Sequence, residues 1–294
     1  MTSTLHPASI VSTRTLETRR PHFEYGEGLS RRHFAQGDLI TSHLVAVLST
    51  LIPEGERFVV DAVKRYRAEI EDPGLRKQAN AFVGQESMHQ REHGRLNDVL
   101  RRMGYPTRVI EGIGAPISYV ARRLPRPTQL ALTAALEHWT AVLAVHALDR
   151  PDDDPRTSVD AEVQAFLRWH LIEEIEHKAV AFDIMQALGT TEEQRMKAMR
   201  QLHWLLGPLL AACLLTSLAA DPAAWNPINV WRSLGQMKAN SALAEEGFMD
   251  DIREWFRAGF HPDERDDSEL LERCRAEAFG PGSIVEQRSV RVAS

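Results

Sequence analysis

The spacing of hydrophobic and polar residues along this chain predicts helices and gives almost no signal for strands. Apolar residues recur every three or four positions in segments long enough to form several helical turns. No βαβ rhythm, glycine-rich phosphate loop or repeat of fixed period appears between them. The predicted helices cover residues 38–71, 73–103, 128–148, 159–188 and 192–219, with further helical stretches over 227–258 and 267–278.

Individual residues indicate where these helices begin, bend and end. Asp38 suits the N-cap of the first helix because its carboxylate can accept a backbone N–H. Pro53 is expected to kink that helix because proline removes a backbone donor and clashes with the preceding turn. Gly104 ends the second helix. The stretch 104–127 is rich in glycine and proline and is predicted to be a loop, and 151–158 is predicted to be a turn.

Four long helices followed by shorter ones predict an all-α protein, specifically a ferritin-like four-helix bundle with additional C-terminal helices. We expect one domain over residues 31–279. Residues 1–30 and 280–294 lack periodic apolar positions, so we expect them to form flexible tails. The N-terminal stretch also lacks the apolar block of a signal peptide, which favours a cytoplasmic location.

Composition and charge indicate a protein with a sizeable core and no general affinity for nucleic acid. The hydrophobic fraction of 43% can build a sizeable core. The formal net charge of −6 gives no general attraction to nucleic acid. Cys213 and Cys274 lie far apart and form neither a zinc knuckle nor a disulfide framework, which fits a reducing cytoplasm.

The segment 204–220 is uncharged and strongly apolar. A membrane-spanning helix needs about 20 apolar residues, and this stretch is shorter and contains Gly207 and Pro208. We favour a buried helix. The alternatives are a lipid-facing helix that associates with a membrane surface, or the wall of a tunnel for a hydrophobic substrate.

The second predicted helix carries metal-ligand side chains on one face. Glu86 and His89 are three residues apart, and His93 follows four residues later. Residues three or four apart share a helix face, so one carboxylate and one or two imidazoles can point at the same place. The sequence allows three roles for His93: a metal ligand, a residue that supports a ligand, or an exposed histidine.

The fourth predicted helix repeats this pattern. His170, Glu174 and His177 fall on one stripe, at steps of four and three residues. Glu173 and Glu176 lie off that stripe, so we expect them either at the surface or behind the ligands. The two helices together supply two Glu-x-x-His units.

Single glutamates on the other two long helices complete the pattern. Glu137 interrupts an apolar stretch of the third helix, where an unpaired carboxylate would be costly to bury. Glu56 follows Pro53 in the first helix, and Glu54 competes with it for the same role. Two Glu-x-x-His units plus one glutamate from each of two further helices are typical of dimetal carboxylate proteins.

The combination of side chains favours two iron ions as the cofactor. Four glutamates match the charge of two divalent ions, and neutral imidazoles bind without adding charge. Oxygen-rich mixed sites suit iron or manganese, so a manganese–iron pair fits as well. The predicted ligands are Glu56, Glu86, His89, Glu137, His170, Glu174 and His177, with His93 as the open case.

Three other histidines and several aromatic residues are predicted to pack in the fold and not to bind metal. His138 turns about 100° away from its neighbour Glu137 along the helix, so we expect it to serve packing. His33 and His43 have no partners at metal-binding spacing. The aromatic residues expected in the core are Trp139, Trp169 and Phe182.

The segments that carry these ligands resemble a bacterial family described as predicted metal-dependent hydrolases. The resemblance covers about residues 30–260 and rests on Pro53–Phe58, Gly84–His93, Leu136–Ala141 and Trp169–Asp183. The order of ligands is also similar to that of p-aminobenzoate N-oxygenase-type diiron proteins. That similarity implies an oxygen-activating diiron site with a third histidine, and it does not require His93.

Three functions are compatible with such a site. The leading interpretation is a diiron oxidoreductase that uses O₂ to oxidise a small, hydrophobic organic substrate. An external electron donor is then needed because no flavin or nicotinamide motif occurs. The alternative is a dimetal hydrolase that uses metal-bound water, and the third is iron storage or a structural metal site. The chain could also form a homodimer, in which a second copy is a further partner.

Overall fold

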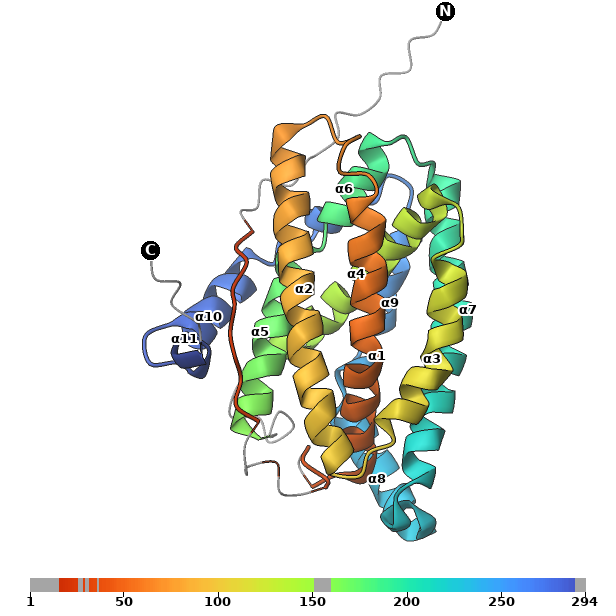
Figure 1. Ribbon diagram of the computed structural model, residues 1–294, viewed down its shortest axis with the longest axis vertical. Coiled ribbons are helices and arrows are strands. Elements are labelled where there is room, and N and C mark those ends of the chain that lie inside the picture. The colour runs from red at the N-terminus through yellow and green to blue at the C-terminus, as the bar shows by residue number, and fades with distance from the viewer. Residues whose placement is uncertain (1–15, 26–28, 30–31, 36, 151–159, 289–294) are drawn as a thin grey trace, which may run out of the picture.

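The computed structural model describes residues 16–25, 29, 32–35, 37–150 and 160–288, and this part of the chain is helical and contains no β-strand (Figure 1). The predicted all-α class is therefore confirmed. The α-helices are α1 (Leu39–Lys64), α2 (Pro73–Arg102), α3 (Thr107–Ala121), α4 (Arg126–Leu148), α5 (Ala161–His177), α6 (Val180–Ala187), α7 (Glu192–Ala219), α8 (Pro227–Asn240), α9 (Phe248–Arg253), α10 (Ser268–Phe279) and α11 (Ile284–Arg288). Short 3₁₀ turns cover Pro222–Trp225, Ala242–Ala244, Glu254–Phe256 and Pro262–Glu264.

Four helices form the centre of the fold. α1 contacts α2 and α4, and α5 contacts α2 and α4, so the four surround a common interior. Trp169 and Phe182 are buried as predicted, whereas Trp139 is only partly buried at the edge of the same core. The remaining helices cover this centre from outside, with α7 against α1 and α4 and α10 against α5.

The start of α1 agrees with the prediction from the sequence. The Asp38 carboxylate accepts the backbone N–H of Thr41 at 2.8 Å and so satisfies one of the free donors at the helix start. α1 continues through Pro53, and the Pro53 carbonyl accepts a hydrogen bond from Gln90 Nε2 of α2 at 2.9 Å. This bond joins the two helices one turn before Glu56.

The first helix ends at Lys64 and not at residue 71, and three further predicted boundaries are wrong. The predicted loop over 104–127 contains α3, because Ile110 is fully buried against α1 and α7 and this burial outweighs the cost of an internal proline. The predicted helix over 159–188 breaks after His177 and resumes at Val180. The stretch 227–258 divides into α8, α9 and two 3₁₀ turns. The predicted turn over 151–158 lies outside the described residues.

The break between α5 and α6 coincides with a buried lysine. Lys178 is 4% exposed, and its ammonium donates to the Arg265 carbonyl at 3.0 Å and to the Asp267 carboxylate at 2.6 Å. A buried charge needs such partners. The lysine therefore ties the end of α5 to the segment between α9 and α10.

Residues 16–25 form an extended segment, here named the N-terminal strap, that runs along α2 and α5 (Figure 1). Phe23 is fully buried and contacts Phe166 and Trp169. The backbone N–H of His22 donates to the Arg288 carbonyl at 2.8 Å, so the strap also meets α11. The described part of the predicted N-terminal tail is therefore packed, and one isolated aromatic residue gives no periodic signal that would reveal it.

The predicted C-terminal tail is also partly ordered. α11 lies within residues 280–294, and its Val285 is 2% exposed in the same hydrophobic cluster as Phe23. Residues 289–294 lie outside the described part of the chain.

Two described helices, α4 and α7, are long and apolar enough to cross a membrane by length and composition alone. In the most apolar 18-residue window of α4, 61% of residues are buried inside the protein, as in a core helix. The corresponding figure for α7 is 17%. The prediction that 204–220 is a buried helix is therefore wrong for most of its residues.

Candidate metal centre

The fold brings all eight predicted residues together in the interior between α1, α2, α4 and α5. None is more than 7% exposed. The helix α1 supplies Glu56, α2 supplies Glu86, His89 and His93, α4 supplies Glu137, and α5 supplies His170, Glu174 and His177. Spacings of three and four residues place the side chains from each helix on one inward face.

One half of the cluster contains two histidines from different helices. His170 Nε2 lies 2.8 Å from Glu174 Oε1 and 3.8 Å from Glu56 Oε1. His89 Nδ1 lies 3.6 Å from the same Glu174 oxygen and 4.0 Å from Glu56 Oε1. These separations suit atoms that could share one metal ion, since typical metal–ligand bonds are about 2.0–2.2 Å long.

The other half is centred on His177. Its Nε2 lies 3.1 Å from Glu86 Oε1 and 3.1 Å from Glu137 Oε2. Glu174 presents its second oxygen to this half, with Oε2 3.6 Å from His177 Nε2. Glu174 therefore faces both halves, and Glu86 does too, because its Oε1 is also 3.9 Å from His89 Nδ1. Either carboxylate could bridge two ions.

The cluster leaves several buried polar atoms without a hydrogen-bond partner. They are both carboxylate oxygens of Glu56, His89 Nδ1, Glu86 Oε1, Glu137 Oε2 and His177 Nε2. The last of these atoms forms close ion pairs with the Glu86 and Glu137 oxygens, at 3.1 Å each, but not in hydrogen-bond geometry. A buried polar atom without a partner costs about 1–3 kcal/mol, and more when it is charged. All these atoms face the same interior, so one or two cations would satisfy them together. The donor set, four carboxylates with three or four imidazoles, fits iron or manganese.

The pKa values reflect the crowding of buried carboxylates in this centre. Burial raises the pKa of Glu56 and of Glu86 well above the ordinary value, and neighbouring carboxylates add to the effect. Burial likewise raises the pKa of Glu137 to about 7. Although burial opposes it, the surrounding carboxylates, Glu174 first, raise the pKa of His177 well above its ordinary value. Repulsion among carboxylates is the condition that a bound cation relieves.

Two imidazoles are oriented from behind by side-chain partners. His89 Nε2 lies 3.0 Å from Glu173 Oε2, and a proton on that nitrogen leaves the Nδ1 lone pair facing the centre. His177 Nδ1 lies 3.2 Å from Gln85 Oε1, which leaves the Nε2 lone pair facing the centre. Metal-binding histidines usually donate their other N–H in this way.

His93 lies behind His170. Its Nε2 is 2.8 Å from His170 Nδ1, and its Nδ1 is 2.9 Å from the Ser49 hydroxyl. Ser49 donates in turn to Asn97 Oδ1 at 2.8 Å. His170 Nε2 is hydrogen-bonded to Glu174 Oε1 at 2.8 Å in this structure. With a proton on each Nδ1 instead, the His170 Nε2 lone pair would be available to a cation. His93 also lies within reach of Glu56, but its hydrogen bond to His170 gives it a supporting position.

Two glutamates that helical spacing places off the ligand stripe are also buried. Glu173 is 0% exposed and accepts from Trp169 Nε1 and Arg19 Nη1, each at 2.9 Å. Glu176 is 2% exposed and accepts from Arg19 at 3.0 Å and from Arg275 at 2.8 Å. Both glutamates therefore lie in the interior and not at the surface, and a position behind the ligands stays a prediction. Their arginine partners come from distant segments, which helical spacing cannot reveal.

The competing and structural residues lie outside the cluster. Glu54 is half-exposed and pairs with Arg122 and Arg57. His138 is buried, its Nε2 is 3.2 Å from the Asp251 carbonyl, and it stacks against Trp255. Glu54 thus lies outside the cluster and His138 makes packing contacts, whereas the role of Glu56 as a ligand stays a prediction.

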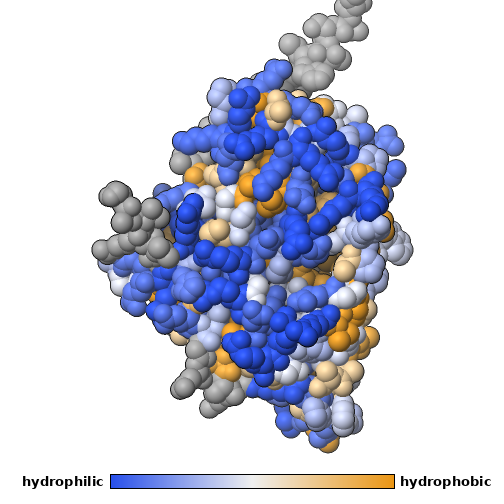
Figure 2. Space-filling model, in the orientation of Figure 1, coloured by the Kyte–Doolittle hydropathy of each residue, from blue (hydrophilic) through white to orange (hydrophobic). Residues whose placement is uncertain are grey.

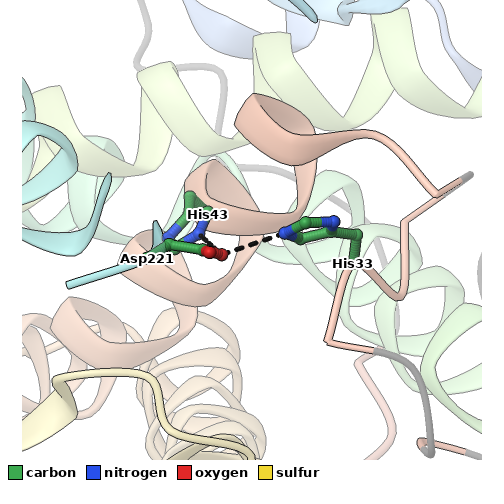
Figure 3. A group of neighbouring side chains, drawn as sticks. All are labelled: His33, His43 and Asp221. Carbon is green, nitrogen blue, oxygen red and sulfur yellow. Dashed lines mark hydrogen bonds and ion pairs between the residues drawn. The ribbon is translucent and has the colours of Figure 1, made fainter. Parts of the chain in front are cut away.

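His33 and His43 do have a partner, contrary to the prediction. Figure 3 shows both imidazoles directed at Asp221, with their Nε2 atoms 2.9 and 3.0 Å from its Oδ2. Arg32 Nε lies 3.0 Å from the same oxygen, so a cation is already present there. Burial works against ionisation, but hydrogen bonds from His43 and His33 hold the pKa of Asp221 well below its ordinary value. We therefore interpret this group as an ion-pair network that joins α1 to the end of α7.

A cavity of about 430 Å³ lies beside α4. Its lining includes His138, Lys178 and Phe260, together with charged residues between α9 and α10. None of the eight cluster residues lines it. The cavity is thus separate from the candidate centre.

Comparison with known proteins gives one match. A family model described as "Predicted metal-dependent hydrolase" matches residues 17–266, which include all eight residues of the cluster. No curated protein and no solved structure matches the chain significantly.

Proposed function

Because the chain belongs to the predicted metal-dependent hydrolase family, we propose that it is a hydrolase whose buried centre holds two metal ions, iron or manganese. The observation that carries this proposal is the set of unpartnered, buried carboxylate and imidazole atoms that face one interior from four helices. We further propose that these helices form a ferritin-like bundle, since such bundles draw ligands from facing helices in this way.

Each half of the cluster would hold one ion. Glu56, His89 and His170 would bind the first, and Glu137 and His177 would bind the second. Glu86 and Glu174 would bridge the two, because each has an oxygen near both halves. Four carboxylates then offset the charge of two divalent ions.

Two bound ions would polarise a carbonyl or phosphoryl oxygen and make a water molecule more acidic. The chain's own residues prepare the site for this chemistry. Glu173, Gln85 and His93 fix the imidazole orientations, and the buried surroundings limit bulk water.

Oxidation by O₂ is the second candidate function. It is favoured by the donor set itself, because two Glu-x-x-His units with single glutamates from two further helices are typical of di-iron and di-manganese carboxylate proteins. This function requires an external electron donor. The substrate in either case is a small organic molecule.

Metal analysis followed by two assays tests the proposal. The full-length protein should contain about two ions of iron or manganese per chain. Under anaerobic conditions, a hydrolase cleaves an ester, amide or phosphate substrate at an unchanged rate. An oxidase instead consumes O₂ and develops a transient visible absorption band when O₂ is added to the ferrous protein.

The variant Glu86→Ala separates the centre from the rest of the fold, since it removes one bridging carboxylate. We expect loss of at least one ion per chain and of activity. Glu54→Ala is the matched control, because Glu54 lies on α1 outside the cluster. Wild-type protein that binds no metal at all, or an equal metal content in both variants, would contradict the dimetal assignment.

A further inference from the structure

The helix α7 exposes an unusual amount of apolar surface. Only 17% of its most apolar 18-residue window is buried, although this window is more hydrophobic than the corresponding one in α4, which is 61% buried. Trp204 is 84% exposed and Leu215 is 68% exposed. Folding normally buries the more apolar of two helices, and an exposed apolar surface of this kind is typical of an interaction site.

Neighbouring elements extend this surface. α3 packs against α7, and the 3₁₀ turn Pro222–Trp225 leads from α7 to α8. We call the combined surface the apolar face, and part of it is seen in Figure 2 as hydrophobic surface along the side where α3 and α7 lie. Its exposed large apolar residues are Val109, Tyr119, Val120, Trp204, Leu205, Leu215, Trp225, Ile228 and Trp231. Among the described residues, Met249 is the one exposed large hydrophobic residue that lies elsewhere.

Three exposed tryptophans lie on the apolar face. Trp204, Trp225 and Trp231 are 84%, 72% and 79% exposed, and the chain has six tryptophans in total. An indole ring combines a large apolar surface with one N–H donor, and such rings concentrate where a membrane meets water.

The charge of these segments differs from that of the whole chain. Residues 107–123 and 192–237 contain seven arginines and lysines, of which one, Arg195, is buried, but four acidic residues. One of those four, Asp221, is buried under Arg32, His33 and His43. The net charge of the whole chain is −6, so positive charge gathers around the apolar face.

We propose that the apolar face binds the surface of an anionic lipid bilayer. Apolar residues flanked by basic residues suit a layer of acyl chains under acidic headgroups. A second copy of the chain would bring like charges together across the interface, which disfavours self-association. This inference does not depend on which reaction the metal centre performs.

The helix lies on the membrane and does not cross it. Cys213 and Ser217 are fully buried on the protein side of α7, and His43 Nδ1 lies 2.7 Å from the Ser217 hydroxyl. A spanning helix would have to break this contact and the packing of α7 against α1 and α4. Only the outer side of α7 therefore enters the lipid.

Vesicle flotation of the full-length protein tests the proposal. Vesicles of phosphatidylcholine with about one third phosphatidylglycerol should bind the protein, and vesicles of phosphatidylcholine alone should bind it less. Raising the salt concentration should weaken binding to the anionic vesicles. The combined variant Trp204→Gln, Leu215→Gln and Trp231→Gln should bind at least about 100-fold less tightly, since it removes three of the nine exposed large apolar side chains, among them the two most exposed tryptophans.

Met249→Gln is the matched control, because Met249 is 43% exposed outside the apolar face. It should bind vesicles like the wild type, and both variants should keep the wild-type metal content. Quenching of wild-type tryptophan fluorescence by brominated lipid gives an independent readout that needs no variant. Wild-type protein that ignores both kinds of vesicle, or equal binding by the triple variant, would overturn the proposal. A dimer in lipid-free solution that the triple variant converts to a monomer would assign the face to a second copy instead.

Discussion

Replacement of Glu137 by glutamine should stabilise the metal-free protein while it weakens metal binding. Glu137 is fully buried among the other carboxylates of the candidate centre, and its Oε2 has no hydrogen-bond partner. Without a metal ion, its negative charge is opposed only by nearby His177. Glutamine has almost the same shape and no charge, so it removes the cost of burying the carboxylate.

The magnitude follows from the pKa. Burial raises the pKa of Glu137 from 4.5 to about 7, and each unit corresponds to about 1.36 kcal/mol. Between these two values the folded protein binds more protons than the unfolded chain, so the free energy of unfolding falls as pH rises. The stabilisation is fully present below pH 4.5 and is lost as pH rises through about 7. Glu137 alone then destabilises the metal-free protein at pH 8 by roughly 3 kcal/mol.

Urea unfolding in the presence of a chelator measures this effect, followed by circular dichroism at about pH 5 and about pH 8. The wild type should be less stable at the higher pH, and Glu137→Gln should remove about 1–3 kcal/mol of that difference. Glu272→Gln is the control, because Glu272 is exposed on α10. If the variant and the wild type lose equal stability over this pH range, Glu137 does not carry an uncompensated charge and the argument fails.

Two further predictions concern residues that support the centre. His93→Gln should keep both ions but bind them about 10–100-fold more weakly in a chelator competition, since it removes the hydrogen-bond partner of His170; loss of a whole ion would instead identify His93 as a ligand. Gly84→Ala should lower the free energy of unfolding by at least about 1 kcal/mol more than Gly94→Ala does. A Cβ at Gly84 would lie 2.5 Å from Thr18 Oγ1 of the N-terminal strap, whereas a Cβ at Gly94 would meet no atom within 4 Å. Equal stability of these two alanine variants would show that the strap does not press on α2.

The sequence predicted the helices and the ligand cluster better than it predicted their surroundings. Glu86 with His89 and Glu174 with His177 share a helix face because of their spacing, and that local rule holds in any helix. Glu137 could be found because a carboxylate inside an apolar run needs a partner. These signals lie within single helices, and the structure assembles them in one interior.

The errors come from contacts between distant segments. Asp221 meets His33 and His43 across more than 170 residues of sequence. α3 forms despite its glycines and proline because Ile110 packs against α1 and α7. The sequence could not show that Trp204 points outward, because an apolar helix has the same composition whether it packs against protein or faces outward.

The contacts of Glu176 have a consequence for how the protein is made. This carboxylate lies behind the candidate metal centre and is paired with Arg19 of the N-terminal strap and Arg275 of α10. A ribosome synthesises the first of these arginines early and the second only when most of the chain has emerged. Glu176 therefore acquires both of its arginine partners only after α10 has been synthesised, so this buried charge becomes fully paired late in synthesis.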